Sequence, residues 1–155
     1  MICRSDAELD KLHQANAITV ETLDLLVRTV EPGVTTAHLD RIAADNLKRH
    51  GVTPAFKGYH GFPATLCVSV NDEVVHGIPS DRALDDGDIV SLDFGVEQDG
   101  FYGDSAVTLP VGEPDEESRR LMTVTEDCLY AGIERMAAGF RLGDVGSAVQ
   151  ERAER

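Results

Sequence analysis

The sequence predicts an α+β protein. Apolar residues recur at helical spacing near the start of the chain and again after Pro114, whereas residues 65–111 are rich in strand-forming residues and turn signals. Strands grouped in one part of the chain, apart from the helices, are typical of the α+β class. We expect a single domain over residues 1–155, because a chain of this length can bury one hydrophobic core and no long linker interrupts it.

Capping signals delimit the first two helices. Ser5 and Glu8 have the spacing of a capping box, and the apolar series that follows predicts a helix over residues 5–30, before a Pro-Gly pair. A second helix is expected over residues 35–50. Its basic last turn and the following Gly51 suit a helix C-terminus, through the helix dipole and a left-handed cap.

Four strands are expected in the middle of the chain. Residues 65–70 alternate between two faces, and residues 73–76 follow an Asn-Asp turn and indicate a returning strand. Strands over residues 88–96 and 101–111 flank the dipeptide Asp99-Gly100. This dipeptide favours a two-residue hairpin, because both central positions of a type I′ turn have positive φ. Helices are then expected over residues 115–138, up to a break at Gly139, and from Gly143 onward.

The predicted hairpin places two carboxylates on one face of the sheet. A turn centred on Asp99-Gly100 pairs Asp93 with Ala106 and Asp104 with Gly95. Because side chains alternate along a strand, Asp93 and Asp104 then lie on the same face as diagonal neighbours, roughly 5–8 Å apart. The opposite face of the first strand is an apolar core surface, formed by Val90, Leu92, Phe94 and Val96.

The two aspartates predict a metal site. Two buried anions so close together repel each other, and no lysine or arginine lies between Ile89 and Glu113 to balance them. A divalent cation would supply the missing charge and use carboxylate oxygens as hard ligands. On spacing alone an exposed sheet face without a function remains an alternative.

Composition excludes several functional classes. The formal net charge of −14 disfavours binding to DNA, because the phosphate backbone would be repelled. No apolar run could span a membrane, and the first residues lack the apolar region of a signal peptide. The three cysteines, Cys3, Cys67 and Cys128, show no CxxC spacing, so we expect a reduced, cytoplasmic protein.

Five motifs in order carry a resemblance to a known family. They are Gly58-Tyr-His-Gly-Phe-Pro63, Cys67-Val-Ser-Val-Asn71, Val75-His-Gly-Ile-Pro79, Gly87-Asp-Ile-Val90 and Asp99-Gly-Phe-Tyr-Gly-Asp104. Together they resemble the N-terminal half of a type I, bacterial methionine aminopeptidase, and the similarity covers essentially the whole chain. The resemblance implies the pita-bread fold, whose N-terminal half has antiparallel β-hairpins packed against helices.

The resemblance also implies a role for each site residue. Asp93 and Asp104 match metal ligands, and His76 matches a catalytic histidine that contacts the substrate. The apolar pocket for the methionine side chain is matched by Tyr59, Phe62 and Cys67.

The reaction implied is removal of the N-terminal methionine from nascent proteins, by a hydroxide held between two divalent ions (Co, Mn, Fe or Zn). Ribosome association is a further expectation of the same resemblance, and a membrane partner is not expected. The family's three remaining metal ligands lie downstream of residue 155, so we expect a truncated catalytic domain, little or no activity of this chain alone, and self-association through an uncovered half-domain face.

Two other readings remain open. A proline-specific aminopeptidase or prolidase shares the fold, but those enzymes carry an additional N-terminal domain, whereas a helix is expected here directly after Met1. The second alternative is a truncated, non-catalytic pita-bread module or remnant that acts by binding. Such proteins often lose the metal-binding aspartates, whereas this chain retains Asp93 and Asp104.

Overall fold

A central antiparallel sheet with two helices on one face forms the first part of the molecule. The computed structural model describes residues 5–155, and Cys3 lies outside this range. The chain divides into two compact units, residues 1–113 and 114–155, each described here by itself. No helix within residues 5–155 is long and apolar enough to cross a membrane.

Helices α1 (Asp6–Val27) and α2 (Thr36–His50) begin and end close to the expected residues. The Ser5 hydroxyl accepts a hydrogen bond from the Glu8 backbone N–H, as the capping box predicts. Helix α1 ends three residues before the expected Val30, because the N–H groups of Thr29 and Val30 both donate to the Leu26 carbonyl and close the last turn. Helix α2 ends as predicted, with Gly51 in the left-handed region.

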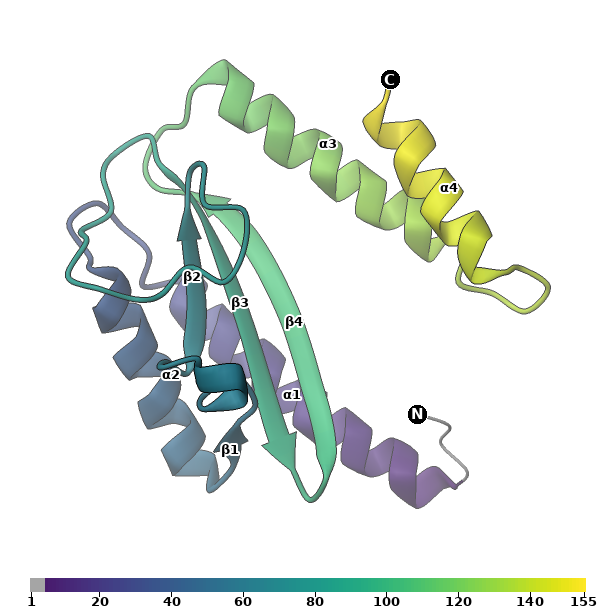
Figure 1. The fold of residues 1–155 in the computed structure, drawn as a ribbon, viewed down its shortest axis with the longest axis horizontal. Helices are drawn as coiled ribbons and strands as arrows, with labels where there is room; N and C mark the ends of the chain where they lie inside the picture. Colours follow the sequence, from purple (N-terminus) through teal and green to yellow (C-terminus); the bar gives the residue numbers. More distant parts are fainter. Residues whose placement is uncertain (1–4) are drawn as a thin grey trace. The chain divides into compact units, whose positions relative to one another are not determined.

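The sheet is centred on β3. Strand β4 (Phe101–Pro110) pairs with the whole length of β3 (Ile89–Gln98). The shorter strands β1 (Thr53–Pro54) and β2 (Leu66–Val70) therefore share the other edge of β3, and all pairings are antiparallel. Figure 1 shows β2, β3 and β4 side by side, with α1 and α2 behind them.

The core lies between the sheet and these two helices. The β3 residues expected to form a core surface are fully buried there, and they meet Leu26 of α1 and Leu39 and Leu47 of α2. Close packing of α1 on β4 depends on Gly103, where a Cβ would lie 2.6 Å from the carbonyl oxygen of Ala15. The helices therefore cover one face of the sheet and leave the aspartate-bearing face outside this core.

The expected strand over residues 73–76 is absent. Backbone N–H groups that a ladder with β2 would use donate to side chains instead. The Val70 N–H donates to the Glu73 carboxylate, and the Gly77 N–H donates to the Ser69 hydroxyl. Two backbone hydrogen bonds remain between this segment and β2: the Val68 N–H donates to the Gly77 carbonyl, and the Glu73 N–H donates to the Val70 carbonyl. The pattern of residue types was strand-like, but side-chain acceptors replaced the ladder.

The second unit is a helical hairpin. Helix α3 (Glu116–Ile133) begins at the Asp115 cap and ends five residues before the expected residue 138, where two hydrogen bonds of the tighter i→i+3 kind close its last turn. Helix α4 (Leu142–Ala153) packs on it at Gly132, where a Cβ would lie 3.1 Å from the Val149 side chain.

Candidate functional site

The face of the sheet opposite the helices carries a pocket of about 570 Å³. All six residues singled out from the sequence line it: Tyr59, Phe62, Cys67, His76, Asp93 and Asp104. They come from segments up to 45 residues apart in the chain, and the fold brings them together at one place.

The strand register that positions the carboxylates is the predicted one. Asp93 pairs with Ala106 and Asp104 pairs with Gly95, so the two aspartates lie on one face as diagonal neighbours on β3 and β4. On its other side Asp93 pairs with Cys67 of β2, which adds the thiol to the same row.

A local turn sets this register. Asp99 and Gly100 have φ values of 53° and 81°, as a type I′ turn requires. The Glu97 carboxylate also accepts the Gly100 N–H at 2.7 Å, which stabilises the turn. The geometry of the two carboxylates was therefore predictable from a dipeptide in the sequence.

The electrostatics of the pocket favour a cation. Burial raises the pKa of Asp93 above its usual value, the neighbouring Asp104 raises it further, and His76 partly offsets both effects. Burial, together with the charges of Asp93, Asp104 and Asp40, raises the pKa of the Cys67 thiol to about 11. Negative charge is thus concentrated at the half-buried Asp93 and at Asp104, which is exposed and not buried as expected, and the Cys67 thiol stays protonated at neutral pH.

An aromatic wall completes the pocket. The short 3₁₀ turn η1 (Tyr59–Gly61) places the Tyr59 ring edge-on against His60, with ring centroids 4.4 Å apart. Phe56 lies over Gly95, where a Cβ would come within 2.7 Å of its ring. Phe56 and Ile78 also line the pocket, and neither was predicted from the sequence. The signal for Phe56 was Gly95, which pairs with Asp104 and leaves room for a ring because it has no side chain.

The donor chemistry of the pocket suits part of a divalent-metal site. Asp93 and Asp104 supply hard oxygen ligands on one face, and their mutual repulsion would be relieved by a cation. Within residues 5–155, however, no group of three or more His, Cys, Asp or Glu side chains is arranged to hold a metal ion. Asp93 and Asp104 would therefore supply two of the ligands of such a site.

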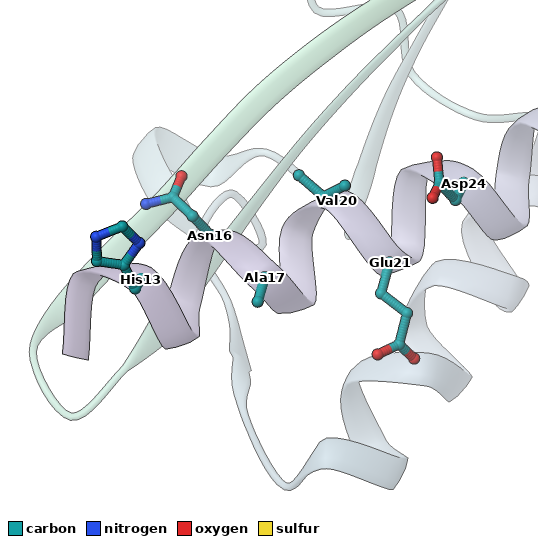
Figure 2. Close-up of a pocket in the computed structure, with 6 residues that line it drawn as sticks. All are labelled: His13, Asn16, Ala17, Val20, Glu21 and Asp24. Atoms are coloured by element: carbon teal, nitrogen blue, oxygen red, sulfur yellow. The ribbon is translucent and has the colours of Figure 1, made fainter. Parts of the chain in front are cut away.

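A second hollow, of about 520 Å³, lies along α1 and is lined by residues of this helix alone (Figure 2). These residues are His13, Asn16, Ala17, Val20, Glu21 and Asp24. Glu21 is paired with His50 of α2 at 3.0 Å and so has a structural role. None of the residues predicted for chemistry lies here, so the sheet pocket is the candidate site.

Comparisons with known proteins match almost the entire chain. The model of metallopeptidase family M24 matches residues 10–155. The chain is 45% identical, over 155 residues, to the methionine aminopeptidase of Clostridium acetobutylicum, and the alignment covers 99% of this chain and 62% of that protein. The chain therefore spans less than two thirds of the length of the curated relatives that it matches first.

Solved structures show the same fold. The methionine aminopeptidase of Rickettsia prowazekii superimposes with a TM-score of 0.95 at 39% identity, over 99% of this chain and 62% of that one. The prolidase of Pyrococcus furiosus gives a TM-score of 0.87 at 19% identity, over 99% and 44% of the two chains. The second likeness concerns the fold alone, and the expected pita-bread architecture is confirmed.

Proposed function

Because the chain belongs to metallopeptidase family M24, we propose that it is the N-terminal portion of a methionine aminopeptidase, which hydrolyses the first peptide bond of nascent proteins. The observation that carries this proposal is the pair Asp93 and Asp104 on one sheet face, inside a pocket with His76 and an apolar wall. The similarity to proteins of that name, at 39–45% identity, supports it.

In this proposal the two carboxylates supply some of the ligands of two divalent ions. Bound there, such ions would polarise the scissile carbonyl and make a water molecule acidic enough to attack it. The aspartate oxygens would accept Co, Mn, Fe or Zn. The protein's own contribution is to place the two carboxylates on one face of the sheet as diagonal neighbours, where a bound cation would offset the burial and repulsion that raise the pKa of Asp93.

His76 would act on the substrate and not on the metal. Its side chain lines the same pocket as the two carboxylates, where an imidazole N–H would stabilise a developing negative charge on the substrate. The methionine side chain would contact the apolar wall, formed by Tyr59, Phe62, Cys67 and the newly found Phe56. The protonated Cys67 thiol would serve there as an apolar surface and not as a nucleophile.

We further propose that residues 1–155 belong to one catalytic domain that is larger than this chain. The family match runs through both compact units, and the relatives are longer. With two metal ligands, the chain alone should have little or no peptidase activity. Its free Cys67 and Cys128 favour a cytoplasmic location, and ribosome association is part of the same proposal.

Calorimetric titration of the chain with Co²⁺ or Mn²⁺ tests the metal site. Weak binding is expected, and Asp93→Asn or Asp104→Asn should lower the affinity about tenfold or more. Asp72→Asn, an exposed aspartate outside the pocket, is the matched control. Equal affinities of wild type and the Asp93→Asn variant would refute the assignment of ligands.

Release of methionine from a Met-Ala-Ser peptide tests the activity. The chain alone, with either metal, should give no turnover above background, and robust turnover would contradict the proposed partial site. A proline-specific enzyme would instead bind Xaa-Pro peptides, and the 19% identity to prolidase does not favour it. A non-catalytic binding module would bind methionyl peptides with no dependence on metal.

A further inference from the structure

The segment that carries His76 has an unusual backbone conformation. His76 has a φ of 60°, in the left-handed region that residues other than glycine rarely adopt. Such a conformation persists only where the surrounding structure holds it, and residues of this kind cluster at functional sites. Contacts of the neighbouring residues must therefore restrain His76.

Gly77 supplies that restraint through both polar groups of its backbone. Its N–H donates to the Ser69 hydroxyl at 3.1 Å, and its carbonyl accepts the Val68 N–H at 3.0 Å. A Cβ at residue 77 would lie 2.0 Å from the Val68 carbonyl oxygen, so only glycine permits this close approach to β2. The chain is thus attached to β2 directly after His76.

Ser69 of β2 differs from Ser91, its partner on β3, in its burial and in the group that its hydroxyl bonds. It pairs with Ser91 of β3, and both side chains lie on the pocket face, one row from Cys67 and Asp93. Ser91 is half-buried and shares a hydrogen bond with the Thr108 hydroxyl at 2.7 Å. Ser69 is only 4% exposed, and its hydroxyl is the group that accepts the Gly77 N–H.

We propose that Ser69 is a positioning residue: its hydroxyl holds Gly77 on β2, keeps His76 in its left-handed conformation, and so orients the imidazole in the pocket. The proposal rests on the proposed function for what His76 does to a substrate. The restraint itself is a property of residues 68, 69, 76 and 77 in this chain. Ser69 contacts no reacting group and acts through His76.

NMR spectroscopy of the metal-free chain tests the restraint. In Ser69→Ala, hydrogen exchange at the Gly77 amide should accelerate about tenfold or more, because its buried acceptor is lost. The ring signals of His76 should shift and lose their contacts with neighbouring pocket protons. Ser69→Thr keeps the hydroxyl and should restore both signatures, and Ser91→Ala removes a hydroxyl from the paired position and should change neither.

Gly77→Ala provides a second variant that leaves Ser69 intact. Its added methyl group should displace the segment and give the same His76 signature, so the test stands even where Ser69→Ala folds poorly. Unchanged Gly77 exchange and unchanged His76 signals in Ser69→Ala would overturn the proposal, as would an equal response in Ser91→Ala or none in Gly77→Ala.

Titration with a Met-Ala-Ser peptide on the same spectra separates this proposal from the proposed function. A peptide that leaves all pocket signals unmoved, in the presence of diamagnetic Zn²⁺, would count against methionyl substrates. The response of Gly77 and His76 to the Ser69 variants would remain as measured.

Discussion

Asp93 is a carboxylate whose ionisation the metal-free fold disfavours. It lies at the centre of a row between Cys67 and Ala106, and both burial and Asp104 raise its pKa. A carboxyl whose pKa is raised by folding binds its proton more tightly in the folded state. Its contribution to stability is therefore full below the unfolded pKa, near 4, and is lost as the pH rises through the folded value.

This linkage predicts that Asp93→Asn stabilises the metal-free chain at neutral pH. In the presence of a chelator, the variant should melt at a higher temperature than the wild type at pH 7. The difference should shrink as the pH falls and disappear below about pH 3, where Asp93 is protonated in both states. Thermal unfolding followed by circular dichroism measures it, with Asp72→Asn as control. A lower melting temperature for Asp93→Asn at pH 7 would contradict the raised pKa.

Cys67 gives a second readout of the same charges. With a thiol pKa of about 11, about one molecule in a thousand carries the thiolate at pH 8. Alkylation by iodoacetamide should therefore be slow in the folded chain, and Asp93→Asn should accelerate it by about threefold to tenfold, because a negative neighbour is removed. Mass spectrometry of the Cys67 peptide measures the rate. The rate at Cys128 in the same molecule is the control, and a slower reaction of Cys67 in the variant would refute the prediction.

At the scale of elements, the position of the pocket depends on how closely α1 approaches the sheet. Gly103 is the contact point, since a Cβ there would lie 2.6 Å from the Ala15 carbonyl oxygen and from the Thr19 hydroxyl. The Thr19 hydroxyl also donates a hydrogen bond to the Ala15 carbonyl. At this point of contact the strand has no room for a side chain.

Gly103→Ala should therefore destabilise the chain by about 1–3 kcal/mol, the usual cost of overpacking. Urea unfolding measures the change, and Gly143→Ala is the control, because it adds the same methyl group where nothing lies within 4 Å. Equal stability of Gly103→Ala and wild type would show that α1 moves to accept the methyl group.

Elements also show where prediction from sequence failed. The strand expected at residues 73–76 depended on residue types alone, and the acceptors that replaced it, Glu73 and Ser69, act across a turn. Phe56 was missed because its place over Gly95 joins residues 39 positions apart. The starts of α1 and α2 were predictable, because the hydroxyls of Ser5 and Thr35 each accept a hydrogen bond from the backbone N–H three residues later in the chain.

At the scale of the whole molecule, the second unit exposes a large apolar surface. Its exposed apolar residues include Leu121, Leu129, Tyr130, Ile133, Met136, Phe140 and Leu142, and Leu142 is 87% exposed. A surface of this kind favours association, as the sequence analysis expected of an uncovered half-domain face. For residues 1–155 by themselves, we expect association of two or more copies through this surface.

Sedimentation velocity should then show association that increases with protein concentration. Replacing Leu121 and Leu129 by glutamate should weaken it about tenfold or more, because charges would be buried in the contact. Val20→Glu, at a position 52% exposed on α1, tests whether any surface charge has this effect. A wild-type chain that stays monomeric at all concentrations would refute this expectation.

The sequence by itself determined the features that depend on residues close together in the chain. The Asp99-Gly100 turn set the register of β3 and β4, and with it the side on which Asp93 and Asp104 lie, because a two-residue turn leaves one pairing. The tertiary structure alone decided how the pocket is closed. The contact of Phe56 with Gly95 joins residues far apart in the chain, and that of Gly77 with Ser69 depends on the irregular segment after β2, so only the folded chain brings these residues within reach of each other.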